Sequence, residues 1–167
     1  MKHTRWQLPL RQMTKIALLS ALCVALRYAF APFPNIQPIS ALFFVLVTVE
    51  GLGFAVLVMS LSMLISSFLL GFGIWVIFQI ISFAVVLVIW RFLPKRSGSV
   101  WATILSGVLA FGYGIVIDSL MAPIFGMPWW SYVLAGLPFN LNHALSTLCF
   151  YPLLHLILRR YYDEKSH

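Results

Sequence analysis

The chain has 167 residues, of which 62% are apolar and 9% are charged, and its mean hydropathy is +0.97. This leaves too little polar surface to cover a water-soluble globule, so the composition excludes an ordinary soluble domain and predicts an integral membrane protein. The formal net charge is +7, but the basic residues form short clusters between apolar runs, as membrane topology requires. We therefore expect contact with membrane lipid and no binding of nucleic acid.

The apolar runs predict a single all-α domain over residues 1–167, a compact bundle of six transmembrane helices. Most runs are about twenty residues long and lack the alternation of barrel strands, which favours helices. The second run is short and meets the third at 50–53, so a bundle of five spans is the main alternative. We expect the first span to stay attached rather than to be cleaved as a signal. The predicted spans are 14–31, 39–49, 51–70, 75–93, 100–122 and 137–158.

Lysine and arginine gather before the first span, after the fourth and after the last. Short loops rich in these residues stay in the cytoplasm. Six spans place all three clusters on one side, whereas five would separate them, so the charge pattern favours six spans with both termini cytoplasmic. The connections on the opposite face are then 28–38, 71–73 and 123–136. An interfacial aromatic belt and a ligand site explain Trp129 and Trp130 in the third connection equally well.

A proline-rich segment, residues 26–42, joins the first two spans. Its three prolines fix φ and lack a backbone N–H, so a regular helix cannot continue and the backbone needs other partners. We interpret the segment as one wall of a binding site. It carries four polar side chains, those of Arg27, Tyr28, Asn35 and Gln37.

Asp118 is an acidic residue deep within an apolar run. A carboxylate in that position is costly unless it faces a cavity, water or a partner, so it is a candidate functional group. Arg27 is its natural partner, because both residues fall in the outer half of the predicted bundle. The pair would either link the first and fifth spans or contact a ligand, and the sequence leaves both alternatives open.

Polar residues also share one face of the fourth span. Trp75, Gln79 and Ser82 recur at helical spacing there. Gln79 beside an aromatic ring suits a ligand that offers amides and a flat surface. The same residue would equally serve as a polar link between neighbouring helices.

The last span carries the richest polar cluster of the chain. Pro138 is a good first-turn residue and places Asn140 and His143 on one face, with Asn142 beside them. The N-terminus of this helix would point outward. Its free N–H groups would then be available to a carbonyl, a carboxylate or a phosphate.

Catalytic and metal-binding patterns are absent from the sequence. It has no His-Glu-x-x-His motif and no glycine-rich phosphate loop, and His143 and His155 lie too far apart on one span to hold one metal ion. Cys23 and Cys149 fall in apolar segments as packing groups. We therefore expect no enzyme, no catalytic residue, no metal site and no permanently bound cofactor. If the protein were a pump, another polypeptide would have to supply the energy, because the sequence has no nucleotide-binding motif.

Small residues line one side of the first span. Ala17, Ala21 and Ala25 recur at every fourth position, so another helix can approach closely along them. They would pack inside this protein or dock a separate subunit. Spacing alone favours internal packing.

This order of features resembles the substrate-binding S component of an energy-coupling factor (ECF) vitamin transporter, and the resemblance covers nearly the whole chain. Such subunits bind a vitamin from outside and dock through the alanine stripe onto a membrane scaffold subunit. Two partner ATPases use the ATP. The resemblance thus implies docking roles for Ala17, Ala21 and Ala25 and a multi-pass protein of a prokaryotic cell membrane.

Three stretches are most similar to the cobalamin-type S components, namely 27–38, 72–79 and 136–144. The resemblance implies that amides hold the edges of a corrinoid while aromatic rings cover its apolar faces. Arg27 and Asp118 would shape or gate the cavity. The implied amide contacts are Asn35, Gln37, Gln79, Asn140 and Asn142, and the implied aromatic contacts are Tyr28, Trp75, Trp129 and Trp130.

Other interpretations stay open. Val76 and Ile77 depart from the more polar or proline-containing sequence expected of a close cobalamin-type relative. An S component for a smaller vitamin such as pantothenate or a pyridoxine-like compound is the first alternative. A small intramembrane enzyme would need Asp118 and His143 to act together as acid and base. A purely structural membrane subunit would bind no ligand saturably.

Overall fold

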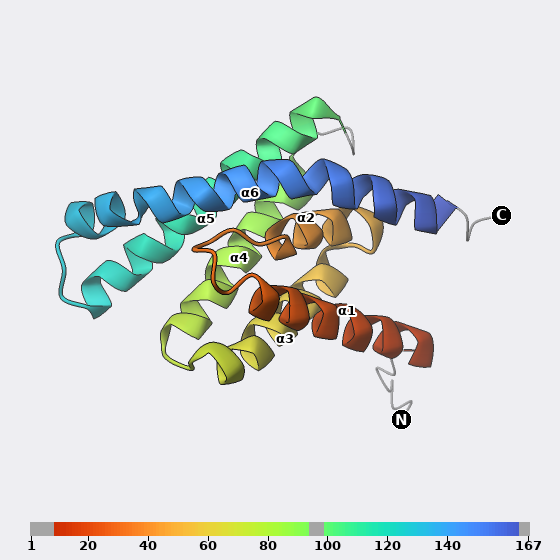
Figure 1. Ribbon diagram of the computed structural model, residues 1–167, viewed down its shortest axis with the longest axis horizontal. Helices are drawn as coiled ribbons and strands as arrows, with labels where there is room; N and C mark the ends of the chain where they lie inside the picture. Colours follow the sequence, from red (N-terminus) through yellow and green to blue (C-terminus); the bar gives the residue numbers. More distant parts are fainter. Residues whose placement is uncertain (1–8, 94–98, 164–167) are drawn as a thin grey trace, which may run out of the picture.

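The computed structural model describes residues 9–93 and 99–163, which form six α-helices and no β-strand (Figure 1). The all-helical bundle predicted from the sequence is confirmed for these residues. Lys2, Arg5, Lys95, Arg96 and Lys165, which entered the topology prediction, lie outside them. The helices are α1 (Leu10–Ala29), α2 (Ile39–Val49), α3 (Leu52–Leu70), α4 (Trp75–Phe92), α5 (Val100–Ile124) and α6 (Trp129–Asp163).

Four of the helices, α3 to α6, are long and apolar enough to cross a membrane. The protein is therefore a helical membrane protein. The second helix begins and ends at the predicted residues, but its 11 residues extend only about 17 Å, against roughly 30 Å for a hydrocarbon core. It cannot span a bilayer by itself.

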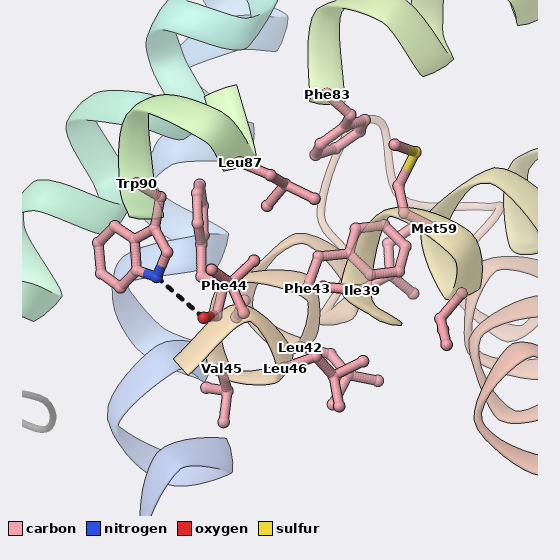
Figure 2. Close-up of a cluster of buried hydrophobic side chains, with 14 of the residues drawn as sticks. Ile39, Leu42, Phe43, Phe44, Val45, Leu46, Met59, Phe83, Leu87 and Trp90 are labelled. Carbon is pink, nitrogen blue, oxygen red and sulfur yellow. Dashed lines mark hydrogen bonds between the residues drawn. The ribbon is translucent and has the colours of Figure 1, made fainter. Parts of the chain in front are cut away.

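Instead, α2 forms the centre of the protein, between α6, α3 and α4. Every residue from Ile39 to Val47 is buried, as expected of a helix that is apolar all round and too short to span a membrane. Figure 2 shows the aromatic rings of Phe43 and Phe44 among side chains of α3 and α4, with Trp90 donating its indole N–H to the Phe44 carbonyl at 2.9 Å. Gly51, at φ 97°, then turns the chain into α3.

Helices α5 and α6 form the most extensive helix pair, and glycines let them approach. A Cβ on Gly114 of α5 would overlap the Asn140 side chain of α6, and a Cβ on Gly136 of α6 would overlap the Asp118 carboxyl group of α5. Each helix thus supplies a glycine socket for a polar side chain of the other. This reciprocal fit fixes the register of the two antiparallel helices.

The helix ends divide between the two ends of the long axis of the molecule. In Figure 1, α1 begins and α6 ends toward one end, whereas the α1–α2, α3–α4 and α5–α6 connections lie toward the other. The α2–α3 junction belongs to the first group, since Lys15 near the start of α1 pairs with Glu50 at 2.5 Å.

The predicted start of the last helix is wrong. The aromatic segment expected as a connection is the first part of α6, which begins at Trp129 and contains Pro138 in its interior. Pro128 precedes the first turn, where its carbonyl accepts a hydrogen bond from the Tyr132 N–H at 3.1 Å. Pro138 therefore leaves no free helix N-terminus beside Asn140. The predicted anion site of N–H groups does not exist there.

Candidate functional site

A pocket of ≈ 370 Å³ lies between the α1–α2 connection and helices α4, α5 and α6. The pocket lies near the end of the molecule at which α5 and α6 are joined. Its residue Asp118 is six residues before the end of α5. Polar and aromatic groups face it from four segments of the chain. Its lining comprises Asn35, Gln79, Tyr113, Ile117, Asp118, Tyr132, Ala135, Gly136, Phe139 and Asn140.

Asp118 and Asn140 form the polar wall between α5 and α6. The Asn140 amide nitrogen donates to Oδ2 of Asp118 at 2.7 Å. The glycine sockets at Gly114 and Gly136 hold both side chains in place. Among the described residues no Lys, Arg or His lies within ion-pair distance of Asp118, so its carboxylate faces the pocket with an amide as its protein partner.

On the opposite wall, Arg27 of α1 holds Gln79 of α4. The guanidinium group donates to Gln79 Oε1 at 3.3 Å and to Ser66 Oγ at 2.8 Å, and it contacts the Met63 sulfur at 3.0 Å. Because a guanidinium can only donate, the Gln79 oxygen is the accepting atom. The Gln79 amide nitrogen is left as the group that can donate to a ligand.

The proline-rich connection closes one side of the pocket. Asn35 adopts a left-handed φ of 57°, which Asn tolerates better than most residues, and its amide nitrogen donates to the Phe139 carbonyl at 3.2 Å. Two residues later, the Gln37 backbone N–H donates to Ser146 Oγ at 2.9 Å, and this hydroxyl donates to the Gln37 carbonyl at 3.0 Å. The connection is therefore hydrogen-bonded to α6 at two points.

Aromatic rings supply the apolar part of the lining. Tyr113 stacks on Phe83 with ring centroids 3.9 Å apart, so the protein core supports it from behind. Tyr132 stacks on Phe125 with an interplanar angle of 13°, and Phe139 completes the wall on α6. Both tyrosines bring a hydroxyl that can donate or accept a hydrogen bond.

The predicted ion pair between Arg27 and Asp118 is wrong. Arg27 binds groups on α3 and α4, whereas Asp118 binds Asn140 on α6. The reason is the order of the helices in space: among the described residues α1 packs against α3 and α2 and has no contact with α5. Both charged residues nevertheless belong to the site, one lining the pocket and one behind it.

Four of the predicted ligand contacts, Asn35, Gln79, Asp118 and Asn140, line the pocket together. The structure places the others outside its lining. Tyr28 and Trp75 are exposed, and so are Trp129 and Trp130, with the Trp129 indole N–H donating to Ser119 Oγ at 2.9 Å. The remaining residues outside the lining are Arg27, Gln37, Asn142 and His143.

His143 is a core residue. It is 2% exposed, its Nε2 is 2.5 Å from Ser40 Oγ at the start of α2, and the Tyr113 and Phe83 rings pack edge-on against it. It therefore links α6 to the central helix. It does not face the pocket that holds Asp118.

Six lining residues were missed by the sequence interpretation. Four of them, Tyr132, Ala135, Gly136 and Phe139, recur at helical spacing on α6. Treating 123–136 as a connection hid this periodicity. Tyr113 and Ile117 repeat four apart on α5, and Ile117 directly precedes Asp118; this spacing was the available signal.

The alanine stripe lies outside the bundle core. Ala17, Ala21 and Ala25 are all exposed, whereas Ile16, Ser20 and Cys23 are the residues of α1 that face inward. Within the part of the chain that the structure describes, the three alanines therefore make no internal helix contact that would bury them. They present a smooth strip along the outer side of α1.

The described residues contain no group of three or more His, Cys, Asp or Glu side chains that could hold a metal ion. No family model, curated protein or solved structure matches the chain. The site must therefore be interpreted from its own geometry.

Proposed function

We propose that this protein is the substrate-binding S component of an ECF-type vitamin importer. It would capture a vitamin from outside a prokaryotic cell and deliver it to a scaffold subunit and two ATPases. The observation that carries the proposal is the pocket itself. Amides, a carboxylate and aromatic rings converge on one cavity near one end of an apolar bundle, as expected of a small-molecule site.

The exposed alanine stripe supports the docking part of the proposal. Small residues allow the close helix contacts that stabilise assemblies within membranes, and no part of the described chain covers Ala17, Ala21 or Ala25. The proposed topology has six membrane segments, with both termini cytoplasmic and the short α2 enclosed by the others. The pocket then opens toward the outer side.

Pocket volume favours a small vitamin over a complete corrinoid. At about 30 Å³ per water molecule, ≈ 370 Å³ corresponds to a ligand of roughly a dozen non-hydrogen atoms. Pantothenate and pyridoxine-like compounds are of this order. A corrinoid is several times larger, so most of it would have to remain outside. Cobalamin is the alternative that the sequence resemblance supports.

Titration of the purified, detergent-solubilised protein with a vitamin panel tests the proposal. The panel contains pantothenate, pyridoxine, pyridoxamine, thiamine, cobinamide and cobalamin, and heat is measured without ATP. Saturable one-to-one binding of a small vitamin is the expected result. Binding of a corrinoid would keep the transporter class and change the substrate, whereas no saturable binding by any member would contradict the proposal.

Replacing Ala21 with Trp should separate docking from binding. The bulky ring would prevent close approach along the stripe, so we expect vitamin uptake in vesicles that also contain an ECF scaffold and its ATPases to fall about tenfold or more. The dissociation constant in detergent should stay unchanged. Leu22→Trp is the matched control, because Leu22 is also exposed on α1 but lies off the stripe. Equal loss of uptake in both variants would contradict the docking role.

A further inference from the structure

We propose that the ligand is a small monocation, an ammonium or similar N–H⁺ compound, with a hydrogen-bond acceptor at its other end. The cation would bind Asp118, and the acceptor would bind the Gln79 amide nitrogen. This inference rests on the proposed function, since it names the chemical class of the molecule taken up. It follows from the orientation of each polar group around the pocket.

The α5–α6 side of the pocket is rich in acceptors. Asp118 uses Oδ2 to accept from the Asn140 amide nitrogen, and a carboxylate has further lone pairs on both oxygens. This bond orients the Asn140 amide with its nitrogen toward Asp118 and uses one of its two N–H donors. A ligand at this wall therefore meets a carboxylate that still needs donors.

Asn35 adds a second acceptor from the α1–α2 connection. Its amide nitrogen donates to the Phe139 carbonyl, which orients the side chain, and its side-chain oxygen can accept from a ligand. Asn35 and Asp118 both line the pocket. A ligand group with two or three N–H donors, such as an ammonium, matches this pair of acceptors.

The α4 side offers the opposite polarity. Arg27 holds Gln79 by its oxygen, and no other hydrogen bond joins Gln79 to the described part of the chain. The nitrogen of Gln79 is thus presented as a donor by Arg27, a half-buried cation that does not itself line the pocket. A carbonyl, hydroxyl or ring nitrogen on the ligand would accept from it.

The charge of the pocket lining also favours a cationic ligand. Asp118 is the only Asp, Glu, Lys, Arg or His among the described residues that line the pocket, and it has no basic partner in the described chain. A carboxylate within an apolar bundle is stabilised by an opposite charge and destabilised by a like one. The lining also contains the aromatic rings of Tyr113 and Phe139, residue types whose ring faces attract cations. An anionic ligand would be repelled.

Matched pairs of probes test the inference with the wild-type protein. Pyridoxamine and tryptamine carry an ammonium where pyridoxine and tryptophol carry a hydroxyl, and all four are of the size that the pocket encloses. At neutral pH we expect at least one amine to bind about tenfold or more tightly than its alcohol, the usual scale of a hydrogen bond to a charged group. Pantothenate and nicotinate serve as anionic probes.

Asp118→Asn should remove the preference, lowering the affinity for the amine about tenfold and changing that for the alcohol little. Glu50→Gln, which removes a carboxylate near the opposite end of the molecule, is the control, and melting curves establish that both variants fold. Equal binding of amine and alcohol, tighter binding of an anion, or binding of other vitamins alone would overturn this inference and leave the proposed function standing. If no probe or vitamin binds, both proposals fail.

Discussion

The packed centre around α2 and the pocket between α4, α5 and α6 are built on different principles. At the centre, nine consecutive residues from Ile39 to Val47 are buried, and shape decides where each side chain lies. At the pocket, polar groups that range from exposed Asn35 to buried Asn140 are fixed by hydrogen bonds to particular atoms. Both regions share α4, yet one is packed with apolar side chains and the other leaves a pocket of ≈ 370 Å³.

This difference indicates that the packed centre mainly determines stability, whereas the pocket mainly determines ligand binding. Loss of a core side chain removes many contacts at once, so its effect should appear in unfolding. A change in the pocket alters which atoms face the ligand, so its effect should appear mainly in binding. Three sets of substitutions test this division.

Trp90→Ala should have the largest effect. The Trp90 side chain is fully buried against Phe44 and Tyr151, and loss of such a side chain costs about 3–5 kcal/mol. We expect a clear fall in melting temperature in detergent, together with loss of folded protein during purification. Trp101→Ala is the control, because Trp101 is 59% exposed and should change the melting temperature little. Similar melting temperatures for the two variants would show that the centre is not the main source of stability.

Gly136→Ala should have an intermediate effect with a different signature. A Cβ at this position would overlap the Asp118 carboxyl group, so either the carboxylate moves or the helices separate, at about 1–3 kcal/mol. Ligand affinity should fall by more than the loss of stability explains. This requires a binding titration beside a melting curve.

Gly112→Ala is its matched control on α5, since a Cβ there would meet no atom within 4 Å. Alanine in place of glycine stabilises a helix interior by up to about 1 kcal/mol, so this variant should melt at or above the wild-type temperature. Unchanged binding by Gly136→Ala would argue against the socket.

The Lys15–Glu50 pair should have the smallest effect. These side chains are 29% and 14% exposed, and partly solvated pairs of this kind contribute about 0.2–1 kcal/mol. A double-mutant cycle with Lys15→Gln and Glu50→Gln should give a coupling energy in this range, measured by chemical unfolding. Ligand binding should not change, because the pair lies away from the pocket. A change in affinity would show that the two ends of the bundle are coupled.

Helix positions were largely predictable because apolar runs of the right length leave few alternatives. The limits of α2 and the start of α4 at Trp75 coincide with the prediction. The start of α6 was not predictable from the rule that proline begins a helix, because Pro128 and Pro138 both satisfy it. Packing against α5 allows the interior proline to remain within a continuous helix.

The polar groups of the site were predictable, but their partners were not. The cost of burying charge and amides in an apolar chain singled out Asp118, Gln79 and Asn140. Which of them meet depends on which helices are neighbours, and periodicity along one helix carries no information about that. The prediction of an Arg27–Asp118 ion pair was wrong for this reason, since α1 lies beside α3 and not beside α5.

The length of α6 has a consequence for the depth of the pocket. Its 35 residues extend about 52 Å, more than the roughly 40–45 Å of a whole bilayer with its headgroups. Exposed tryptophans at 129 and 130 begin this helix and exposed arginines at 159 and 160 lie near its end, and in the proposed topology these residues would anchor it at the two water interfaces. Gly136, seven residues from the aromatic end, then lies about 10 Å below it. A ligand there would reach Asp118 near the boundary between headgroups and hydrocarbon, without crossing the hydrocarbon interior.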